Sequence, residues 1–436
     1  MREARDKVRR FLKDNGAWHE DIDVDEFCDI FRGEMHKGLA GRDGSLAMIP
    51  TYIEVGKNIP KDKRVIVLDA GGTNFRVAAV HFDRSGSPVI ENFVQKPMPG
   101  LDREVGKKEF FATIAEYIAG VVDASDSIGF CFSYPTEIMP NRDGRLIRFC
   151  KEVKAKQVEG ELIGQNLITA IKAAGHEGNK RVAILNDTVA TLLAGMSASG
   201  KRTFGGYIGF ILGTGSNCCY VESNRKIIKT SDLDPDKEQI VNVESGSFGK
   251  APRGAIDFQL DESTLDPGKY TFEKMFSGGY LGALCLKALQ QATKQGLLSG
   301  IAGEQLLGSR DLETKDVNSL LRYPQGDNPL AVICAKAAEQ DRAAVWYVLD
   351  GLIERAARVV AAMLSSVVLE TDKGLDPCEP VCITAEGTTF YELKSLRERV
   401  ESYMRSFLQD RHDRFVEFVH VEYATLIGAA IAGLTN

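Results

Sequence analysis

The sequence predicts an α/β protein built from two related halves. A short apolar strand runs into a turn of glycine and threonine and returns as a second strand around Gly71, and the same pattern recurs around Gly213. The two turns lie 142 residues apart, counted as 213 minus 71. A chain of 436 residues is too long for one ordinary core, so a unit repeated at this spacing predicts two domains of related architecture.

The first half begins with a polar, amphipathic helix, and we expect it to end in a glycine-rich passage from Gly33 to Gly44. Three apolar segments then follow at short intervals, at residues 64–69, 75–82 and 89–94. Because tight turns join them, they predict an antiparallel meander of three strands.

The remaining elements alternate between strands and helices. In the first half we expect a helix at 107–122, a strand at 127–133, a helix that ends near Ala174 and a strand at 181–185. In the second half we expect strands at 206–212 and 217–222, a long helix at 345–369, a strand at 380–384 and a closing helix at 424–434. The long helix is interrupted by charged residues, and its apolar residues recur every three or four positions. This pattern predicts a buried face and not a membrane span.

Composition excludes several classes of partner. The hydrophobic fraction is 44%, the charged fraction is 26% and the net charge is −7, as in a soluble globular protein. Nothing in this balance attracts nucleic acid or anionic lipid, so we expect neither nucleic acid nor a membrane as a partner. The nine cysteines are odd in number and never spaced C-x-x-C, which argues against disulfides and zinc and favours a cytoplasmic location.

The first turn carries the segment Asp69-Ala-Gly-Gly-Thr-Asn-Phe-Arg76. Paired glycines let a backbone approach a phosphate closely and direct N–H groups at its oxygens. Thr73 and Asn74 add side-chain donors, Arg76 adds charge, and Asp69 is placed to hold Mg²⁺ through water. An ordinary hairpin with glycines at positive φ explains the same residues equally well. This segment alone therefore fits both a phosphate-binding turn and an ordinary hairpin.

Two further segments suit a nucleotide. Gly213-Thr-Gly-Ser-Asn217 repeats the first turn in the second half, and together the two turns could hold one triphosphate from both sides of a cleft. Ala385-Glu-Gly-Thr-Thr389 lies between a strand and a helix, where N–H groups at the helix start suit a ribose or an α-phosphate. Taken alone, this third segment is more simply explained as a capped helix start.

Asn186-Asp187 follows a strand and opens a helix at Thr188. Most such pairs only cap a helix, with Asp or Thr as the capping residue. A carboxylate at a strand end beside a cleft can also accept the proton of a hydroxyl. It need not be a strong base, because phosphoryl transfer depends mainly on positioning and charge stabilisation.

Several segments of the chain resemble the eukaryotic-type hexokinases, in their single-unit form. The matching segments are Phe31–Leu39, Met48–Thr51, Leu68–Val77, Gly129–Pro135, Leu185–Val189, Gly213–Asn217, Asn242–Gly249 and Phe272–Gly282. The resemblance implies two actin-like (ribonuclease H-like) α/β domains around an ATP/sugar cleft. The small domain would comprise residues 64–203 plus the closing helix 424–436, and the large domain residues 1–63 and 204–423.

The resemblance also implies an activity: transfer of the γ-phosphoryl group of ATP to the 6-hydroxyl of a hexose, the first step of glycolysis. Glucose is the expected hexose, with mannose and fructose as alternatives, and no obligate protein partner is expected. The implied catalytic residues are Asp187, as general base, and Lys151. The implied sugar ligands are Ser133, Lys151, Asn186, Asp187, Asn217, Glu244 and Glu273. The implied ATP ligands are Asp69, Gly71, Gly72, Thr73, Asn74, Arg76, Gly213, Thr214, Gly215, Gly387 and Thr388, with Asp69 also holding Mg²⁺ through water.

The chain departs from the family pattern at three places. The family's Thr-Lys-Gly-Phe in the sugar loop is Cys150-Lys-Glu-Val153 here, so only Lys151 carries over. The tryptophan after the first sugar glutamate is Ser245, and the aspartate of the adenosine turn is Glu386. These differences bear on sugar preference more than on the class of reaction.

Three other functions compete with a hexose kinase. A bacterial-type glucokinase would need a cysteine-rich zinc motif that the sequence lacks. A non-catalytic sugar sensor would be expected to lose the base or a phosphate segment, yet Asp69, Asp187 and Thr214 are all present. An actin-like or chaperone-like ATPase shares the glycine turns but has no reason to keep the two glutamates.

Overall fold

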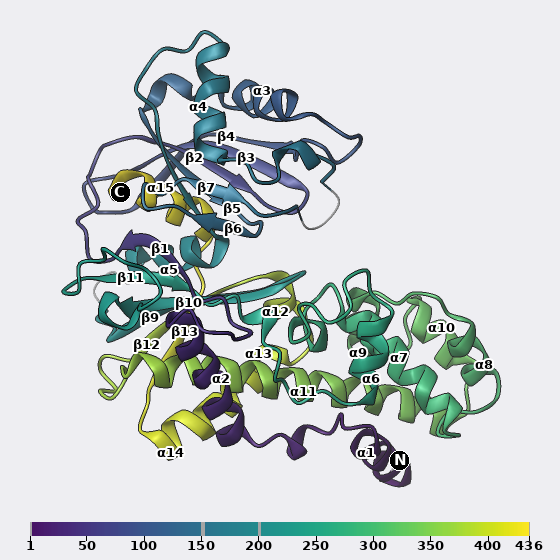
Figure 1. Ribbon diagram of the computed structural model, residues 1–436. Helices are drawn as coiled ribbons and strands as arrows, with labels where there is room; N and C mark the ends of the chain where they lie inside the picture. The colour runs from purple at the N-terminus through teal and green to yellow at the C-terminus, as the bar shows by residue number, and fades with distance from the viewer. Residues whose placement is uncertain (1, 150–152, 199–201, 436) are drawn as a thin grey trace.

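The computed structural model describes residues 2–149, 153–198 and 202–435. The chain forms two bodies, each organised around one β-sheet, and Figure 1 shows them one above the other. The N-terminus lies beside the lower body and the C-terminal helix lies in the upper body. The predicted α/β class with two sheet-containing domains is confirmed.

The upper body contains a five-stranded sheet in the order β4-β3-β2-β5-β8. Its strands are β2 (Val65–Ala70), β3 (Asn74–Phe82), β4 (Pro88–Pro97), β5 (Ser127–Phe132) and β8 (Arg181–Leu185), beside a separate ribbon of β6 (Thr136–Ile138) and β7 (Gly144–Leu146). The first three pair antiparallel, so the predicted meander is confirmed, whereas β2, β5 and β8 run parallel.

Both faces of this upper sheet are covered, which explains why β2 is apolar from Val65 to Leu68, before Asp69 at the site edge. Ile66 and Leu68 face the core beneath α3 (Lys107–Ile118) and α4 (Ile163–Ala173), whereas Val65 faces the opposite core beneath α15 (Ala424–Thr435). Alternate residues of a strand point to opposite faces, so a strand buried on both sides needs no polar residues.

The lower body contains a six-stranded sheet in the order β1-β11-β10-β9-β12-β13. Its strands are β1 (Ile49–Glu54), β9 (Gly206–Leu212), β10 (Ser216–Ser223), β11 (Glu238–Asn242), β12 (Val381–Glu386) and β13 (Val416–Val419). The described helices around it are α1 (Arg2–Asp14), α2 (Val24–Leu39), α6 (Ala255–Glu262), α7 (Leu281–Lys294), α8 (Gly300–Gly308), α9 (Thr314–Arg322), α10 (Pro329–Ala335), α11 (Glu339–Thr371), α12 (Thr388–Glu392), α13 (Leu396–Met404) and α14 (Asp410–His412). The long predicted helix is α11, and most of its residues are buried. Across the described ranges, no helix has the length and apolarity needed to span a bilayer.

Two helices form the layer between the sheets. α5 (Asp187–Ala198) packs on α15 and on β9 of the lower sheet, and α15 packs on β2 and β5. Glycines permit these close contacts. A Cβ at Gly428 of α15 would lie 1.9 Å from the carbonyl oxygen of Ala190, and one at Gly209 of β9 would lie 2.1 Å from that of Thr188. The order of layers is therefore sheet, α15, α5, sheet.

The prediction of a glycine-rich passage at Gly33–Gly44 was wrong in its first part, because α2 continues to Leu39. Gly38 lies inside the helix, where a Cβ would come within 2.3 Å of the carbonyl oxygen of Leu46. This glycine therefore serves close packing and does not break the helix. The helix expected at 107–122 is also shorter, since α3 ends at Ile118.

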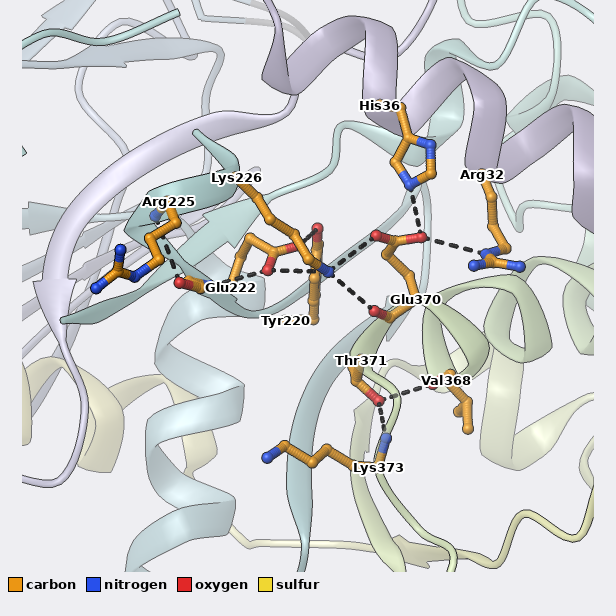
Figure 2. Close-up of polar contacts among 11 residues, drawn as sticks. Arg32, His36, Tyr220, Glu222, Arg225, Lys226, Val368, Glu370, Thr371 and Lys373 are labelled. Carbon is orange, nitrogen blue, oxygen red and sulfur yellow. Dashed lines mark hydrogen bonds and ion pairs between the residues drawn. The ribbon is translucent and has the colours of Figure 1, made fainter. Parts of the chain in front are cut away.

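A buried carboxylate ties three distant segments of the lower body together (Figure 2). Glu370, near the end of α11, accepts hydrogen bonds from Arg32 Nε at 3.2 Å and His36 Nε2 at 2.9 Å, both on α2. Lys226, just after β10, approaches its other oxygen at 3.2 Å. Because a buried charge is costly unless it is paired, these partners hold α2 and β10 against α11.

Candidate functional site

The carboxyl ends of three parallel strands meet at one edge of the upper sheet. Asp69 on β2 is paired in register with Cys131 on β5, and Cys131 in turn with Leu185 on β8. Ser133 and Asn186-Asp187 follow the last residues of β5 and β8. The edge therefore gathers Asp69, Ser133, Asn186 and Asp187, at the place where open α/β sheets bind ligands.

Asp187 contributes to the raised pKa values of two neighbouring groups, one in each body. The pKa of the Cys131 thiol lies well above its usual value, first because the thiol is buried and then because Asp69 and Asp187 are both negative and near. The pKa of Glu244, in the lower body, is also raised, mainly by burial and further by the charge of Asp187. Asp187 is thus close enough to interact electrostatically with groups of both bodies.

The start of α5 fixes the segment Asn186-Asp187-Thr188. Asn186 Oδ1 accepts hydrogen bonds from the Thr188 backbone N–H at 2.9 Å and from its hydroxyl at 2.6 Å, so Asn186 acts as the cap. Asp187 Oδ1 also accepts from the Thr188 N–H, at 2.9 Å. The sequence had suggested Asp or Thr as the cap. The structure assigns the main capping contacts to the asparagine. Because these contacts use only its Oδ1, the NH₂ group of Asn186 takes no part in the cap.

On the lower body, Glu244 is held by two amides. Asn242 Nδ2 donates to Glu244 Oε1 at 2.7 Å, and Asn217 Nδ2 donates to Asn242 Oδ1 at 2.7 Å and to Glu244 Oε1 at 3.3 Å. Asn217 Oδ1 accepts from the backbone N–H groups of Cys218 and Ser245. Glu244 itself has φ +58°, a left-handed conformation that is unusual for a glutamate. In this structure Asn217 therefore positions Glu244, and Oε2 of Glu244 has no partner among the described residues.

Asn242 was missed by sequence reasoning although the sequence contained a signal. It is the last residue of β11 and lies two residues before Glu244, so it is near the carboxylate along the chain. An amide at this spacing from a functional carboxylate was therefore placed to contact it.

The second glycine turn is supported from two sides. The carbonyl oxygen of Gly213 accepts from the Gly278 N–H at 2.8 Å and from the Thr389 hydroxyl at 2.9 Å, and the Thr214 carbonyl accepts from the Gly279 N–H at 2.9 Å. Gly387, which has φ +115°, lies so close that a Cβ on it would be 2.3 Å from the Leu212 carbonyl oxygen. The segments Gly213–Asn217 and Ala385–Thr389 are therefore in direct contact, and Thr388 begins α12 beside them.

Glu273 also reaches this turn. Its Oε2 accepts a hydrogen bond from the Ser216 backbone N–H at 3.0 Å. A Cβ at Gly215 or at Gly246 would lie within 3.1 Å of the same carboxylate oxygen. Glu273 thus lies between the second glycine turn and the segment that carries Glu244.

The first glycine turn is built differently. Gly71 donates its N–H to the Asn74 carbonyl at 3.0 Å, and its own carbonyl accepts from the Tyr134 hydroxyl at 2.8 Å. Neither Gly71 nor Gly72 has a positive φ, so the alternative of a hairpin that needs glycine for its backbone conformation does not hold. Thr73 is exposed and Asn74 is half-buried, as expected for groups that face a ligand.

One oxygen of Asp69 is occupied by two partners. Arg76 Nη1 and the Thr425 hydroxyl each donate to Oδ2 at 2.9 Å. Arg76, which the sequence suggested as a phosphate contact, is therefore also the ion-pair partner of Asp69. Thr425 was missed, because it lies on α15 at the far end of the chain and no local pattern connects it with β2.

A narrow pocket lies between the two bodies at this place. Its lining includes Phe132 and Asn186 from the upper body, and Ile49, Asn242 and Glu244 from the lower body. The predicted sugar ligands Asn186 and Glu244 thus face one space. Lys151, the other predicted catalytic residue and sugar ligand, lies outside the described residues, as does Cys150.

Two sequence models of the hexokinase family match the chain, one over residues 12–197 and the other over residues 207–435. Human hexokinase HKDC1 is 33% identical over 383 residues, which covers 82% of this chain and 41% of that protein. Hexokinase-1 of Schizosaccharomyces pombe is 28% identical over 427 residues, which covers 92% of this chain and 85% of that protein. The chain spans less than half the length of human HKDC1 and of hexokinase-1 from Pongo abelii, of which it covers 44%.

Solved structures agree with the sequence comparisons. Hexokinase from Schistosoma mansoni complexed with glucose matches with a TM-score of 0.82 at 25% identity, over 100% of this chain and 99% of that chain. Another hexokinase crystal structure, at 21% identity, has a TM-score of 0.75 and shows the same fold over 99% of each chain. The expected actin-like sugar-kinase fold is confirmed. By the matches of both halves, the chain belongs to the hexokinase family.

Proposed function

We propose that this protein transfers the γ-phosphoryl group of ATP to the 6-hydroxyl of a hexose, with glucose as the first candidate and mannose and fructose as alternatives. The observation that carries the proposal is the position of Asp187. It lies at the end of β8, and its charge acts on Glu244 of the opposite body, beside the pocket that Asn186 and Glu244 line. A base on one side and a hydroxyl-binding carboxylate on the other suit a sugar held between them.

In the proposed reaction, Asp187 accepts the proton of the attacking hydroxyl. The free oxygen of Glu244 and the NH₂ group of Asn186 bind other hydroxyls, together with Ser133 and Glu273. Carboxylates and amides bind such groups directionally, and a site built for them rejects analogues that lack a hydroxyl. The contribution of the protein to phosphoryl transfer is then mainly the alignment of the hydroxyl with the phosphate.

The two glycine turns are proposed to bind the phosphates of ATP, and Gly387 and Thr388 its ribose or α-phosphate. The absence of positive φ at Gly71 and Gly72 supports this role, because it leaves close approach of a ligand as the reason for glycine there. Arg76, Thr73 and Asn74 lie on the same hairpin.

Asp69 fits the requirements of a Mg²⁺ ligand. Its Oδ2 is held by Arg76 and Thr425, and the carboxylate also interacts with the Cys131 thiol of β5. The described residues contain no cluster of three metal-ligating side chains, which suits Mg²⁺, because this ion is usually held by one or two carboxylates, phosphates and water. When bound with ATP, Mg²⁺ would neutralise the charge that develops on the transferred phosphoryl group.

We also propose the domain division 64–203 plus 424–436 and 1–63 plus 204–423, with closure of the two domains around the sugar. Sugar ligands on both bodies support closure, and closure would exclude water that competes for the phosphoryl group. Small-angle scattering should give a smaller radius of gyration with saturating hexose than without it. An unchanged profile would contradict closure but not the reaction.

A coupled assay for ADP with glucose, mannose, fructose and glucosamine tests the function directly. We expect ADP release that depends on a hexose and yields the 6-phosphate ester. ADP release at the same rate without sugar would indicate an ATPase, and hexose binding without turnover would indicate a sensor. A hexose kinase of this type would act in the cytoplasm, in the first step of glycolysis, with no obligate protein partner.

The altered sugar loop supports a further prediction on preference. Cys150 replaces a threonine whose hydroxyl donates and accepts hydrogen bonds, whereas a thiol does either weakly. Loss of one such bond costs about 0.5–1.5 kcal/mol, or roughly threefold to tenfold in affinity. Cys150→Thr should lower the KM for glucose by a few-fold and leave the KM for ATP unchanged. An unchanged or higher KM for glucose would indicate a loop shaped for another sugar.

A further inference from the structure

A second polar hollow lies in the upper body, at the opposite end of β8 from Asp187. It has a volume of about 660 Å³, within the range typical of small-molecule sites. Three basic residues from three elements line it. Arg142 lies in the turn between β6 and β7, Lys172 in the last turn of α4, and Arg181 at the first residue of β8.

Among the residues that the structure describes, these three cations have no acidic partner. Within the described ranges, none of Arg142, Lys172 and Arg181 forms an ion pair with a carboxylate, although the protein carries a net charge of −7. The contact of Arg181 is a weak one, from Nη2 to the Ser127 hydroxyl at 3.4 Å. The basic group around Glu370 is different, because there Arg32, His36 and Lys226 all converge on a buried carboxylate (Figure 2).

The acidic residues near the hollow are engaged elsewhere. Asp143, which contributes to its lining, accepts hydrogen bonds from the backbone N–H groups of Gly144 at 2.7 Å, Gly164 at 2.7 Å and Gln165 at 2.9 Å. It is therefore a buried cap for α4. Asp126, which precedes β5, lies 3.4 Å from Lys180. The lining thus carries three cations and one carboxylate, and the oxygens of that carboxylate are occupied by backbone N–H groups.

The backbone at Arg142 is held in a strained conformation. Its φ is +65°, which an arginine rarely adopts. Its N–H donates to the Met139 carbonyl at 2.7 Å, and its carbonyl accepts from the Ile184 N–H at 2.8 Å. These bonds tie the turn to β8 and fix the position from which the side chain leaves the backbone. Strain of this kind is concentrated at functional sites.

We propose that this hollow binds a small phosphorylated molecule, through charge-assisted hydrogen bonds from Arg142, Lys172 and Arg181. Guanidinium groups bind phosphate oxygens in pairs, and an ammonium group adds a point charge. The site is distinct from the proposed ATP site, because β8 runs from Arg181 at the hollow to Leu185 next to Asn186-Asp187. The occupant is a free metabolite with one or two phosphate groups.

Pyrophosphate and fructose 1,6-bisphosphate are suitable probes. The bisphosphate cannot accept a phosphoryl group in the proposed reaction, because its 6-hydroxyl already carries a phosphate. Titration calorimetry is done on the full chain, both without and with a saturating non-hydrolysable ATP analogue, so that binding at the glycine turns is separated from binding at the hollow. We expect one site for at least one probe, weakened about tenfold or more by Arg142→Gln and by Lys172→Gln. Binding of pyrophosphate alone would identify a phosphate subsite, and binding of the bisphosphate alone would identify a sugar-phosphate site.

Lys108→Gln is the matched control, since it removes one exposed positive charge from α3 of the same body, and it should leave the dissociation constant unchanged. Lys172→Glu is a second variant, at an exposed position of α4 that tolerates either residue, and it should abolish binding. If Lys108→Gln weakened probe binding equally, the loss of net positive charge would explain the effect, and the proposal would fail. It would also fail if neither probe bound, or if binding survived Lys172→Glu.

Discussion

The two glycine turns have similar sequences but different surroundings. The Gly213 turn is held by Gly278, Gly279 and Thr389, segments far from it in the chain, and it contacts Gly387. The Gly71 turn is held mainly by its own hairpin and by Tyr134. A Cβ at Gly71 would meet the Asn74 carbonyl oxygen at 3.6 Å, and one at Gly213 would meet the Gly387 Cα at 3.8 Å, both ordinary contacts. A Cβ at Gly278, which supports the Gly213 turn, would lie 2.2 Å from the Thr389 hydroxyl.

The same contrast applies to the acidic residues. In the upper body, Asp69 and Asp187 are placed by the ends of parallel strands. In the lower body, Glu244 is placed by a left-handed backbone and a network of amides. We infer that variants of the upper body act mainly on the rate of phosphoryl transfer and that variants of the lower body act mainly on the affinity for substrates.

The largest effect is expected from Asp187→Ala. Loss of a general base typically costs 10²–10⁴-fold, so kcat should fall by about two orders of magnitude or more. Binding of hexose should weaken less, because other groups also contact the sugar. Asp187→Asn is the control that keeps size and removes basicity. Steady-state kinetics that retain more than about a tenth of kcat in both variants would show that another residue is the base.

Gly278→Ala tests the support of the Gly213 turn, and Gly71→Ala tests the Gly71 turn, which lacks such support. The new methyl group at 278 would meet the Gly213 carbonyl oxygen at 2.7 Å and displace the turn. Overpacking of this kind costs about 1–3 kcal/mol, so we expect the KM for ATP to rise by roughly tenfold. Gly71→Ala should leave the thermal stability of the protein nearly unchanged. Equal thermal stability of the two variants would remove the distinction between the turns.

The amide network predicts a moderate effect on sugar affinity. Asn242→Ala removes the donor to Glu244 Oε1 and the acceptor for Asn217, so the carboxylate loses its orientation. Loss of a hydrogen bond to a charged group costs about 1.5–3 kcal/mol. Because part of this cost weakens the binding of the sugar, the KM for hexose should rise several-fold. The KM for ATP should not change. Asn166→Ala, on α4 and outside the cleft, is the matched control, and a similar rise there would contradict the assignment.

The smallest expected effect is a pH dependence of stability from Glu386. Burial raises its pKa to about 7, against the opposing effects of the Gly387 N–H and the charge of Arg76. A carboxyl group whose pKa is raised in the folded state stabilises that state at low pH, and this contribution is lost as pH rises through about 7. The melting temperature of Glu386→Gln should therefore fall less than that of wild type between pH 5 and pH 8. Parallel melting curves would show that Glu386 is ionised throughout.

The sequence by itself determined the long helix, the repeated turns and most strands, because each depends on a local period or on glycine at a fixed place. It did not predict β1, β6, β7, β11 and β13. It also indicated the family, which the comparisons confirmed. It located the residues that follow strand ends, such as Asp69 and Asp187, since the carboxyl ends of parallel strands meet at one edge. The roles of these residues stay predictions.

Only the tertiary structure decided which distant residues complete the site. Thr425 reaches Asp69 from the last helix, and Gly278 supports a turn that precedes it by more than sixty positions. Likewise, Gly38 belongs to a helix because Leu46 packs against it, although the local sequence suggested a break. Such contacts depend on how α15, α2 and the loops fold back in space, and hydrogen bonding across the chain leaves no periodic signal in the sequence.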